Sequence, residues 1–372
     1  MANITEHLRE PNITIDQHVR SQQIALGQAL SERRAVYLDT KFWILLRNAQ
    51  KDAQTSEAHE LLTRLRNAVA SGVLFCPISE SIFLELMKQE DVASRSATAS
   101  LIDELSLGAT LIPEDVRLAT EIAHFMHASS GRTNLHPLKH LVWTKLSYVM
   151  GVTHPSNTPF DAATERAMQK AFFDHMWAIS LTEIIAILGS NKMSDVSLGD
   201  VATDLNAGIA AHAHELRSFA QSYSAEAQGI VDLVGGMAID IMISMARDQG
   251  ITLPPPTSEE RKRSETSFKN LFRLALERNK AREALRTMHI LASLHASVRW
   301  NKGRKLSGND LYDFHHAAAA LGYCDAFFTE RSLRTTVTQE HLGLDRAYDC
   351  HVVADVQGAI DWVACDGKPD RT

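Results

Sequence analysis

The sequence has 372 residues, of which 45% are hydrophobic and 22% charged. Such a chain is too apolar to be disordered and long enough for one large domain or two. Its formal net charge of −7, taken as an average over the molecule, argues against a general polyanion binder. The four cysteines form no CxxC pair, so we expect buried thiols in a reducing compartment and no disulfide or zinc cage. No apolar leader or membrane-spanning run stands out, and we expect a cytoplasmic protein with no membrane partner.

The N-terminal part of the chain alternates between strand and helix patterns. The apolar run at residues 35–38 predicts a short strand buried on both faces, and it ends on Asp39. Leucines at helical spacing predict a helix over residues 57–70, followed by a second short strand over residues 73–76. Ser79 then fits the N-cap of another helix. This alternation is typical of α/β architecture.

The middle of the chain, residues 98–305, shows almost only helical periodicity. Residues 161–188 predict a long helix or a pair of helices. The sequence Thr-Ser-Glu-Glu at residues 257–260 is a capping box, so we expect a helix to begin there. We interpret this stretch as an all-α insertion, which would select substrate, bind a regulatory protein or gate access.

The α/β pattern returns near the C-terminus. We expect a helix over residues 309–321, a strand over residues 326–329 and another over residues 350–354. The predicted fold class is therefore α/β, with a short parallel sheet flanked by helices and interrupted by the insertion. The α/β domain would be split into residues 1–97 and 306–372.

Acidic residues follow the first two predicted strands. Asp39 stands where a buried strand passes into a helix, the edge where open α/β sheets bind ligands. Taken alone, Asp39 is about as well explained as the N-cap of that helix. Glu85 lies on the shoulder of the next helix's apolar face, which is ordinarily a simple boundary position.

Four more acids surround the last helix and strand. Asp310 and Asp313 are three residues apart and share a helix face. Asp325 precedes the following strand, and Glu330 comes just after it. Asp310 alone would be a helix cap, and Asp325 alone a turn residue. Their recurrence at successive strand–helix junctions indicates a site instead.

These segments resemble the PIN-like nuclease domain over about residues 33–90 and 306–356. The motifs that carry the resemblance are YLDT with Asp39, ISESIFLEL with Glu85, DLYDFHHAAAAL with Asp313, and YCDAFFTERSL. The chain departs from the family at the last motif, because Glu330 follows Thr329 directly and Arg331 stands where many members carry Asp. The fourth acid is therefore open between Asp325 and Glu330.

The resemblance implies a PIN-like sheet and Mg²⁺- or Mn²⁺-dependent cleavage of a phosphodiester, usually in RNA. The residues it implicates in catalysis are Asp39, Glu85, Asp313, Asp325 and Glu330, of which the first four would be metal ligands. Oxygen donors suit such hard cations, and two ions could activate the attacking water and stabilise the leaving oxygen. The sequence thus predicts a metal-dependent endoribonuclease, and a toxin, defence-effector or RNA-processing role is compatible with it. The alternatives are a DNA-directed nuclease, including one acting on single-stranded DNA, and an inactive PIN-like interaction module.

Two neighbours of the acids could support the site. Asp310 is a reserve acid, and His316 points closer to Asp313 than His315 does by helical arithmetic. His316 could orient substrate or metal-bound water, although a structural role is the more ordinary one for such a residue.

The charge is unevenly distributed along the chain. Residues 261–305 contain thirteen Lys or Arg and three Glu, giving 13 − 3 = +10, so the remainder carries −7 − 10 = −17. A solvated helix face explains a basic helix taken in isolation. Because this stretch ends just before Asp310, however, it could hold the phosphate backbone beside the acids. The predicted nucleic-acid contacts are Arg299, Lys302, Arg304 and Lys305.

Overall fold

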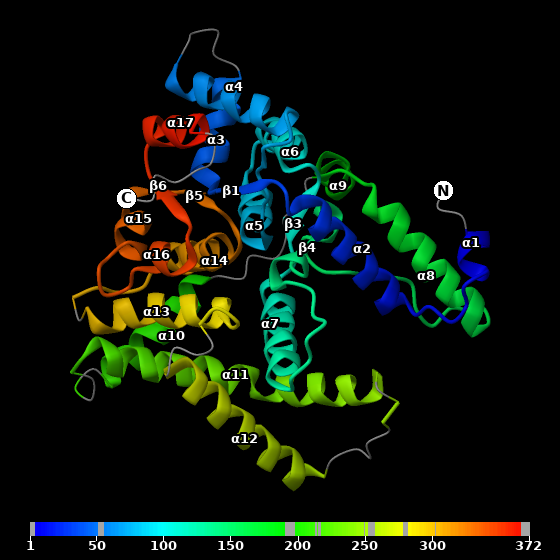
Figure 1. The fold of residues 1–372 in the computed structure, drawn as a ribbon. Helices are drawn as coiled ribbons and strands as arrows, with labels where there is room; N and C mark the ends of the chain where they lie inside the picture. Colours follow the sequence, from blue (N-terminus) through cyan, green and yellow to red (C-terminus); the bar gives the residue numbers. More distant parts are fainter. Residues whose placement is uncertain are drawn as a thin grey trace.

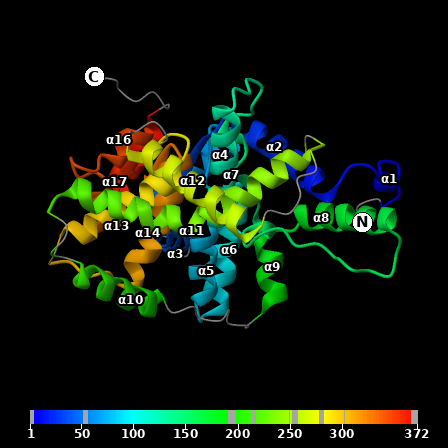
Figure 2. The same ribbon diagram turned by 90° about the horizontal axis from the view of Figure 1, so that it is seen from below.

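The protein is mostly helical, with a small parallel sheet and a separate two-stranded sheet (Figures 1 and 2). The computed structural model describes residues 4–50, 56–189, 198–212, 214, 217–248, 250–251, 257–277, 282–301 and 303–365. In chain order the elements are α1 Ile4–Leu8, α2 Ile15–Leu30, β1 Arg34–Leu38, α3 Thr40–Ala49, α4 Glu57–Ala70, β2 Leu74–Phe75, α5 Glu80–Lys88, α6 Val92–Ser106, β3 Ala109–Leu111, α7 Glu114–Ser129, η1 Leu138–His140, β4 Trp143–Lys145, η2 Leu146–Tyr148, α8 Ala162–Trp177, α9 Leu181–Leu188, α10 Leu198–Ala211, α11 Phe219–Asp248, α12 Ser258–Glu277, α13 Arg286–Trp300, α14 Gly308–Tyr323, β5 Ala326–Phe328, α15 Arg331–Val337, α16 Leu344–Tyr348, β6 His351–Val353 and α17 Val356–Ala364.

The central sheet has the strand order β2-β1-β5-β6, and all of its pairs are parallel. From β1 the chain passes outward to β2 on one side, and it later returns to β5 on the other side of β1. The gap between the carboxyl ends of β1 and β5 is therefore a topological switch point, where open α/β sheets form a ligand crevice. Both predicted halves of the α/β pattern contribute strands to this sheet.

The two faces of this sheet are covered by different helices. Tyr37 pairs in register with Phe327, and its ring lies 5.9 Å from that of His316 on α14. One residue further along β5, Phe328 contacts the rings of Phe42 on α3 and Trp362 on α17. Successive side chains of a strand point to opposite faces, so α14 covers one face while α3 and α17 cover the other.

The small parallel sheet is compatible with the predicted α/β fold, but the expected all-α insertion contains the antiparallel pair β3–β4. Each of these strands has three residues, too few to show a period of two in the sequence. The predicted boundary between residues 97 and 98 falls inside α6. Ile102 of α6 and Leu111 of β3 belong to the same buried core as the central sheet, so the first part of residues 98–305 is built onto that sheet.

A second buried core lies below the central sheet in Figure 1, among α7, α11, α12 and α13. Its centre includes Ile122, Val231, Phe272 and Met288. By length and composition alone, α11 is a helix that could cross a membrane, and it packs against α7, α12 and α13. The absence of a membrane partner stays a prediction.

Two local predictions in this region are confirmed. Residues 161–188 form the helix pair α8 and α9, bent by 104° at the break between them. The capping box before α12 is present, since Thr257 N donates to Glu260 and Glu260 N donates to the Thr257 hydroxyl.

Candidate functional site

Asp39 lies at the carboxyl end of β1, where the chain enters α3. Its backbone N–H donates to Phe328 O at 3.0 Å, which places it beside Thr329 at the end of β5. One carboxylate oxygen accepts from Phe42 N at 3.1 Å, so Asp39 is the N-cap of α3 as well as a candidate ligand. Only 6% of the residue is exposed. Burial raises the pKa of Asp39 to about 6, against the opposing effects of Phe42, Thr329 and His316.

Asp313 reaches the same edge from the second turn of α14. Burial raises the pKa of Asp313 to about 7, and the charge of nearby His316 opposes this shift. The charges of Asp39, Glu330 and Asp310 raise the pKa of Asp313 further. Four acids from three segments of the chain therefore share one electrostatic environment at the switch point.

Glu85 is joined to this edge through hydrogen bonds. Its Oε2 accepts from the hydroxyl of Thr40, the first residue of α3, and from His316 Nε2 at 3.0 Å. The other ring nitrogen of His316 lies 2.8 Å from the Tyr37 hydroxyl, which lies 2.5 Å from the hydroxyl of Ser79. Burial alone would raise the pKa of Glu85, but the bond and charge of His316, together with the bond from Thr40 and the charge of Lys88, outweigh it and lower the pKa. Glu85 is thus held as a carboxylate.

His316 is 2% exposed and lies at the centre of this chain of hydrogen bonds. Because a carboxylate can only accept, the imidazole donates its Nε2 proton to Glu85. His316 therefore positions Glu85. Ser79 occupies the predicted N-cap position of α5, but its hydroxyl serves Tyr37 and makes no cap hydrogen bond.

The two candidates for the fourth acid lie at opposite edges of the sheet. Glu330 directly follows Thr329 at the carboxyl end of β5, is exposed, and raises the pKa of both Asp39 and Asp313. Asp325 precedes β5 and accepts from Ala35 N at 2.8 Å, at the start of β1. The structure therefore does not bring Asp325, predicted as a catalytic residue and metal ligand, to the other acids, because a parallel strand separates it from them.

Asp310 acts mainly at the start of α14. It is the third residue of a capping box with Ser307, and it accepts from Arg304 Nη2 at 2.6 Å. Burial would raise the pKa of Asp310, but the hydrogen bonds from Ser307 and Arg304 outweigh it and lower the pKa. Its charge nevertheless reaches Asp313, so Asp310 is a supporting acid held by a cation.

The four predicted nucleic-acid contacts differ in their exposure and in their position relative to the acids. The side chain of Arg299 is 17% exposed and paired with Glu226 at 2.7 Å, so the structure does not present it beside the acids. Arg304 lies next to the acids through Asp310, and Lys305 is exposed just before α14. Lys302 lies outside the described residues.

The basic helix α12 does not form a wall beside the acids. It packs on α11, which packs on α13, and α13 is the member of this group that packs extensively against α14 (Figure 1). Several of its cations are paired with acids of α11 or α12, including Arg261 with Asp240 and Lys269 with Asp232. Proximity in sequence failed here because α13 intervenes between the basic helix and the site.

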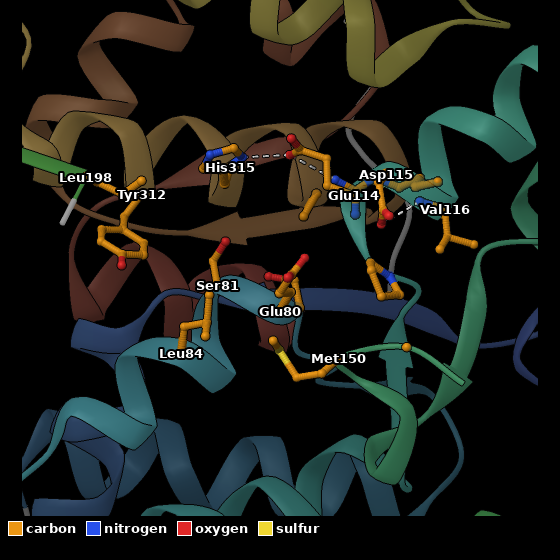
Figure 3. Close-up of a pocket in the computed structure, with 15 residues that line it drawn as sticks. Glu80, Ser81, Leu84, Glu114, Asp115, Val116, Met150, Leu198, Tyr312 and His315 are labelled. Carbon is orange, nitrogen blue, oxygen red and sulfur yellow. Dashed lines mark hydrogen bonds and ion pairs between the residues drawn. The ribbon is translucent and has the colours of Figure 1, made fainter. Parts of the chain in front are cut away.

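A cavity of about 520 Å³ lies between the N-termini of α5 and α7 and the side of α14 (Figure 3). His315 points into it and bonds to Glu114 at 2.8 Å, while Glu80 and Asp115 add further acids. Ser79 lines this cavity and also begins the hydrogen-bonded chain to Glu85. An acidic lining of this kind suits a neutral or cationic group better than a phosphate.

Several residues around the site were missed in the sequence. Thr40, Tyr37, Ser79 and Glu114 make contacts across the fold; the first three lie within the quoted motifs but received no role in the site. Asp115 and Glu114 follow Pro113 at the start of α7, which is the ordinary place for acids in a helix. Only the polar Tyr37 within an otherwise apolar strand gave a signal, because a buried hydroxyl needs a partner.

The site acids are spread rather than gathered into a cage. Within the described ranges, they supply no group of three whose ligand atoms all lie within 4.8 Å of one another. The carboxylates interact through their charges and not through direct contact. Water or a substrate oxygen could therefore lie between them. Mg²⁺ commonly keeps several waters and takes only one or two carboxylates.

No family model, curated protein or solved structure matches this chain.

Proposed function

We propose that this protein is a divalent-metal-dependent nuclease, most specifically an endoribonuclease, acting at the carboxyl edge of β1 and β5. The observation that carries the proposal is the coupling of Asp39, Asp313 and Glu330 at the switch point of the sheet. Structural carboxylates of a surface seldom converge in this way, because each raises the energy of its neighbours' charged forms.

The donor set suits Mg²⁺ or Mn²⁺. Asp39, Asp313 and Glu330 offer hard oxygen ligands, and Glu85 would reach the cation through Oε1, since Oε2 accepts from Thr40 and His316. The raised pKa values of Asp39 and Asp313 indicate that their charged forms are unfavourable without a nearby cation. Bound divalent ions would activate a water and stabilise the departing oxygen of the phosphodiester.

The protein's own residues would prepare this chemistry in three ways. His316 holds Glu85 in one orientation and keeps it ionised. Arg304 balances Asp310, so less negative charge faces an approaching phosphate. Exposed Lys41 and Arg331 follow Asp39 and Glu330 in the chain, and we assign them to phosphate contact in place of the remote basic helix.

The test is cleavage of an end-labelled, single-stranded RNA, with a DNA of the same sequence in parallel. We expect RNA cleavage at internal positions with millimolar Mg²⁺ or Mn²⁺, and none with EDTA. Asp313→Asn should abolish cleavage, while the matched control Asp325→Asn, with the same change at the other edge of the sheet, should retain it.

Each other outcome changes the proposal. Metal-dependent cleavage of DNA alone would make the protein a DNA-directed nuclease with the same site. Cleavage that survives Asp313→Asn would show that the site lies elsewhere. A folded protein that binds Mn²⁺ but cleaves neither polymer would be an interaction module.

A further inference from the structure

Two histidines and one aspartate converge at the far end of the molecule from the acidic site. His7 Nε2 lies 2.8 Å from Asp174 Oδ2, and His18 Nε2 lies 2.6 Å from Asp174 Oδ1. The three ligand atoms lie within 4.8 Å of one another. The residues come from α1, α2 and α8, which lie to the right of the central sheet in Figure 1 and project together in Figure 2.

The environment of these side chains limits their freedom. The ring of His18 packs edge-on against Phe173 at 5.7 Å, and the ring of His7 packs edge-on against His18 at 5.1 Å. The side chains of His7, His18 and Asp174 are 13%, 15% and 29% exposed. They are therefore held in place by packing, yet an ion could reach them from solvent.

The short N-terminal helix α1 gives an independent reason to look for an additional interaction that holds it to α8. It has five residues and no buried residue, and an isolated helix of that length is not stable in water. Lys170, which is 1% exposed, donates to Glu10 O at 2.9 Å just beyond α1. Within α1 itself, the side chain of His7 contacts Asp174 of α8 and its carbonyl oxygen accepts from Lys170 at 3.5 Å, so His7 contributes directly to docking this helix.

We propose that His7, His18 and Asp174 bind one divalent transition-metal ion, with Zn²⁺ as the preferred ion, and so tie α1 and α2 to α8. Two imidazoles and a carboxylate form a common three-ligand set for such ions, which leaves a position for water. This proposal is independent of the nuclease, whose site offers only carboxylates and suits hard cations.

The separations fit a modest rearrangement on binding. Zinc bonds of about 2.0–2.2 Å in a tetrahedral shell place ligand atoms about 3.4 Å apart. The two His–Asp separations are 2.8 and 2.6 Å, so the ion enters as these contacts open by less than about 1 Å. Each Nε2 then gives its lone pair to the metal, and the ring proton is carried on Nδ1.

The experiment uses the full-length protein, stripped with EDTA, dialysed, and re-equilibrated with Zn²⁺ or Co²⁺. Elemental analysis should give one Zn²⁺ per chain, and Co²⁺ should produce visible absorption typical of four- or five-coordination. Hydrogen exchange of residues 4–10 should slow when Zn²⁺ is added. His18→Gln should weaken Zn²⁺ binding at least about tenfold, because changes even to outer-shell partners cost that much.

Matched variants make the result decisive. His7→Gln alters a helix with no buried residue, so the remaining fold should survive if His18→Gln is unstable. His175→Gln changes an exposed histidine adjacent to Asp174 and should bind Zn²⁺ normally. Asp313→Asn should also bind Zn²⁺ normally, which separates this site from the nuclease. No stoichiometric Zn²⁺ in the wild type, or binding unchanged in both His7→Gln and His18→Gln, would leave only a hydrogen-bonded cluster.

Discussion

Two aspartates at opposite edges of one sheet have different environments. Asp39 follows β1 and Asp325 precedes β5, and the two strands are parallel neighbours. Asp39 is buried, and its pKa is raised to about 6 by burial. Asp325 is 40% exposed, accepts from Ala35 N at 2.8 Å, and lies 3.9 Å from Lys139.

The difference follows from strand direction. Ala35 lies near the start of β1 and Asp39 directly after its end, four residues later, which corresponds to about 13 Å along an extended strand. At the amino edge, a carboxylate satisfies a single backbone amide. At the carboxyl edge, two strands end beside the starts of α3 and α15, so acids from several segments meet. An acid next to an apolar strand is informative only when the edge on which it lies is known.

The strongest test of this comparison is the loss of activity in Asp39→Asn and Asp313→Asn. Each change removes one ligand charge while keeping the shape of the side chain. We expect metal-dependent cleavage to fall by at least about 100-fold, the upper end of what second-shell changes cost. The measurement is kcat/KM with a labelled RNA at saturating Mn²⁺.

The control for these variants is thermal unfolding in EDTA. Both should be as stable as the wild type or more so, because each replaces a carboxyl whose charged form is made unfavourable by partial or full burial. Full activity in either variant would remove that residue from the site.

The next largest effect is the pH dependence of cleavage, which should follow the ionisation of the acids at the carboxyl edge. Metal binding needs ionised carboxylates, and the pKa values of Asp39 and Asp313 are raised to about 6 and about 7. Because both carboxyls must lose a proton, cleavage should rise by about tenfold per pH unit between about pH 6 and 7, more steeply below about pH 6, and level off above about pH 7. A pH–rate profile that is already flat at pH 5 would contradict these shifts.

The stability of the metal-free protein should depend on pH in the opposite sense. A carboxyl with a raised pKa favours its protonated form in the folded state. Its contribution to the free energy of unfolding is therefore fully present below its ordinary pKa of 3.8. That contribution is lost as pH rises through about 6, and for Asp39 it amounts to roughly 3 kcal/mol or less. Chemical unfolding from pH 4 to 8 should show this loss, Asp39→Asn should reduce it, and Mn²⁺ should offset it.

Asp325→Ala should lower the free energy of unfolding without changing the rate of cleavage. It removes the acceptor of Ala35 N, and an unsatisfied amide costs about 1–3 kcal/mol. Asp325→Asn, which keeps an acceptor oxygen, should cost less. Urea unfolding gives the stability, and the RNA assay should give unchanged kcat/KM. A loss of activity equal to that of Asp39→Asn would return Asp325 to the catalytic set.

The strands and the carboxyl-edge acids could be predicted because they depend on local pattern. A short apolar run identifies β1, and Asp39 marks its end. The alanines of α14, the helix that carries Asp313, allow it to lie close against β1 and β5. These features need only neighbouring residues, which is why a sequence alone indicates them.

Other features depend on contacts between distant segments and left little trace in the sequence. The strands β3 and β4 have three residues each, and the remoteness of α12 results from the packing of α11 and α13. His7, His18 and Asp174 are separated by up to 167 residues, so no spacing rule joins them. The separation of Asp325 from Asp39 and Glu330 depends on the direction of β5 relative to β1.

The smallest predicted effect concerns the hydrogen bonds behind the carboxyl edge. Tyr37→Phe removes the hydroxyl between Ser79 and His316, which are both buried. We expect a stability loss of about 1–2 kcal/mol, because a buried partner is left unsatisfied. Activity should fall less than about tenfold, since Glu85 keeps its direct bonds to Thr40 and His316.

Ser79→Ala is the matched control, because its hydroxyl lies one hydrogen bond further from Glu85 than that of Tyr37. Its effect on kcat should be smaller than that of Tyr37→Phe, while both variants should leave KM for RNA nearly unchanged. A fall in kcat for Tyr37→Phe as large as that for Asp39→Asn would mean that Tyr37 touches the reacting groups. Equal kcat in wild type and Tyr37→Phe would mean that packing around α14 alone orients His316 on Glu85.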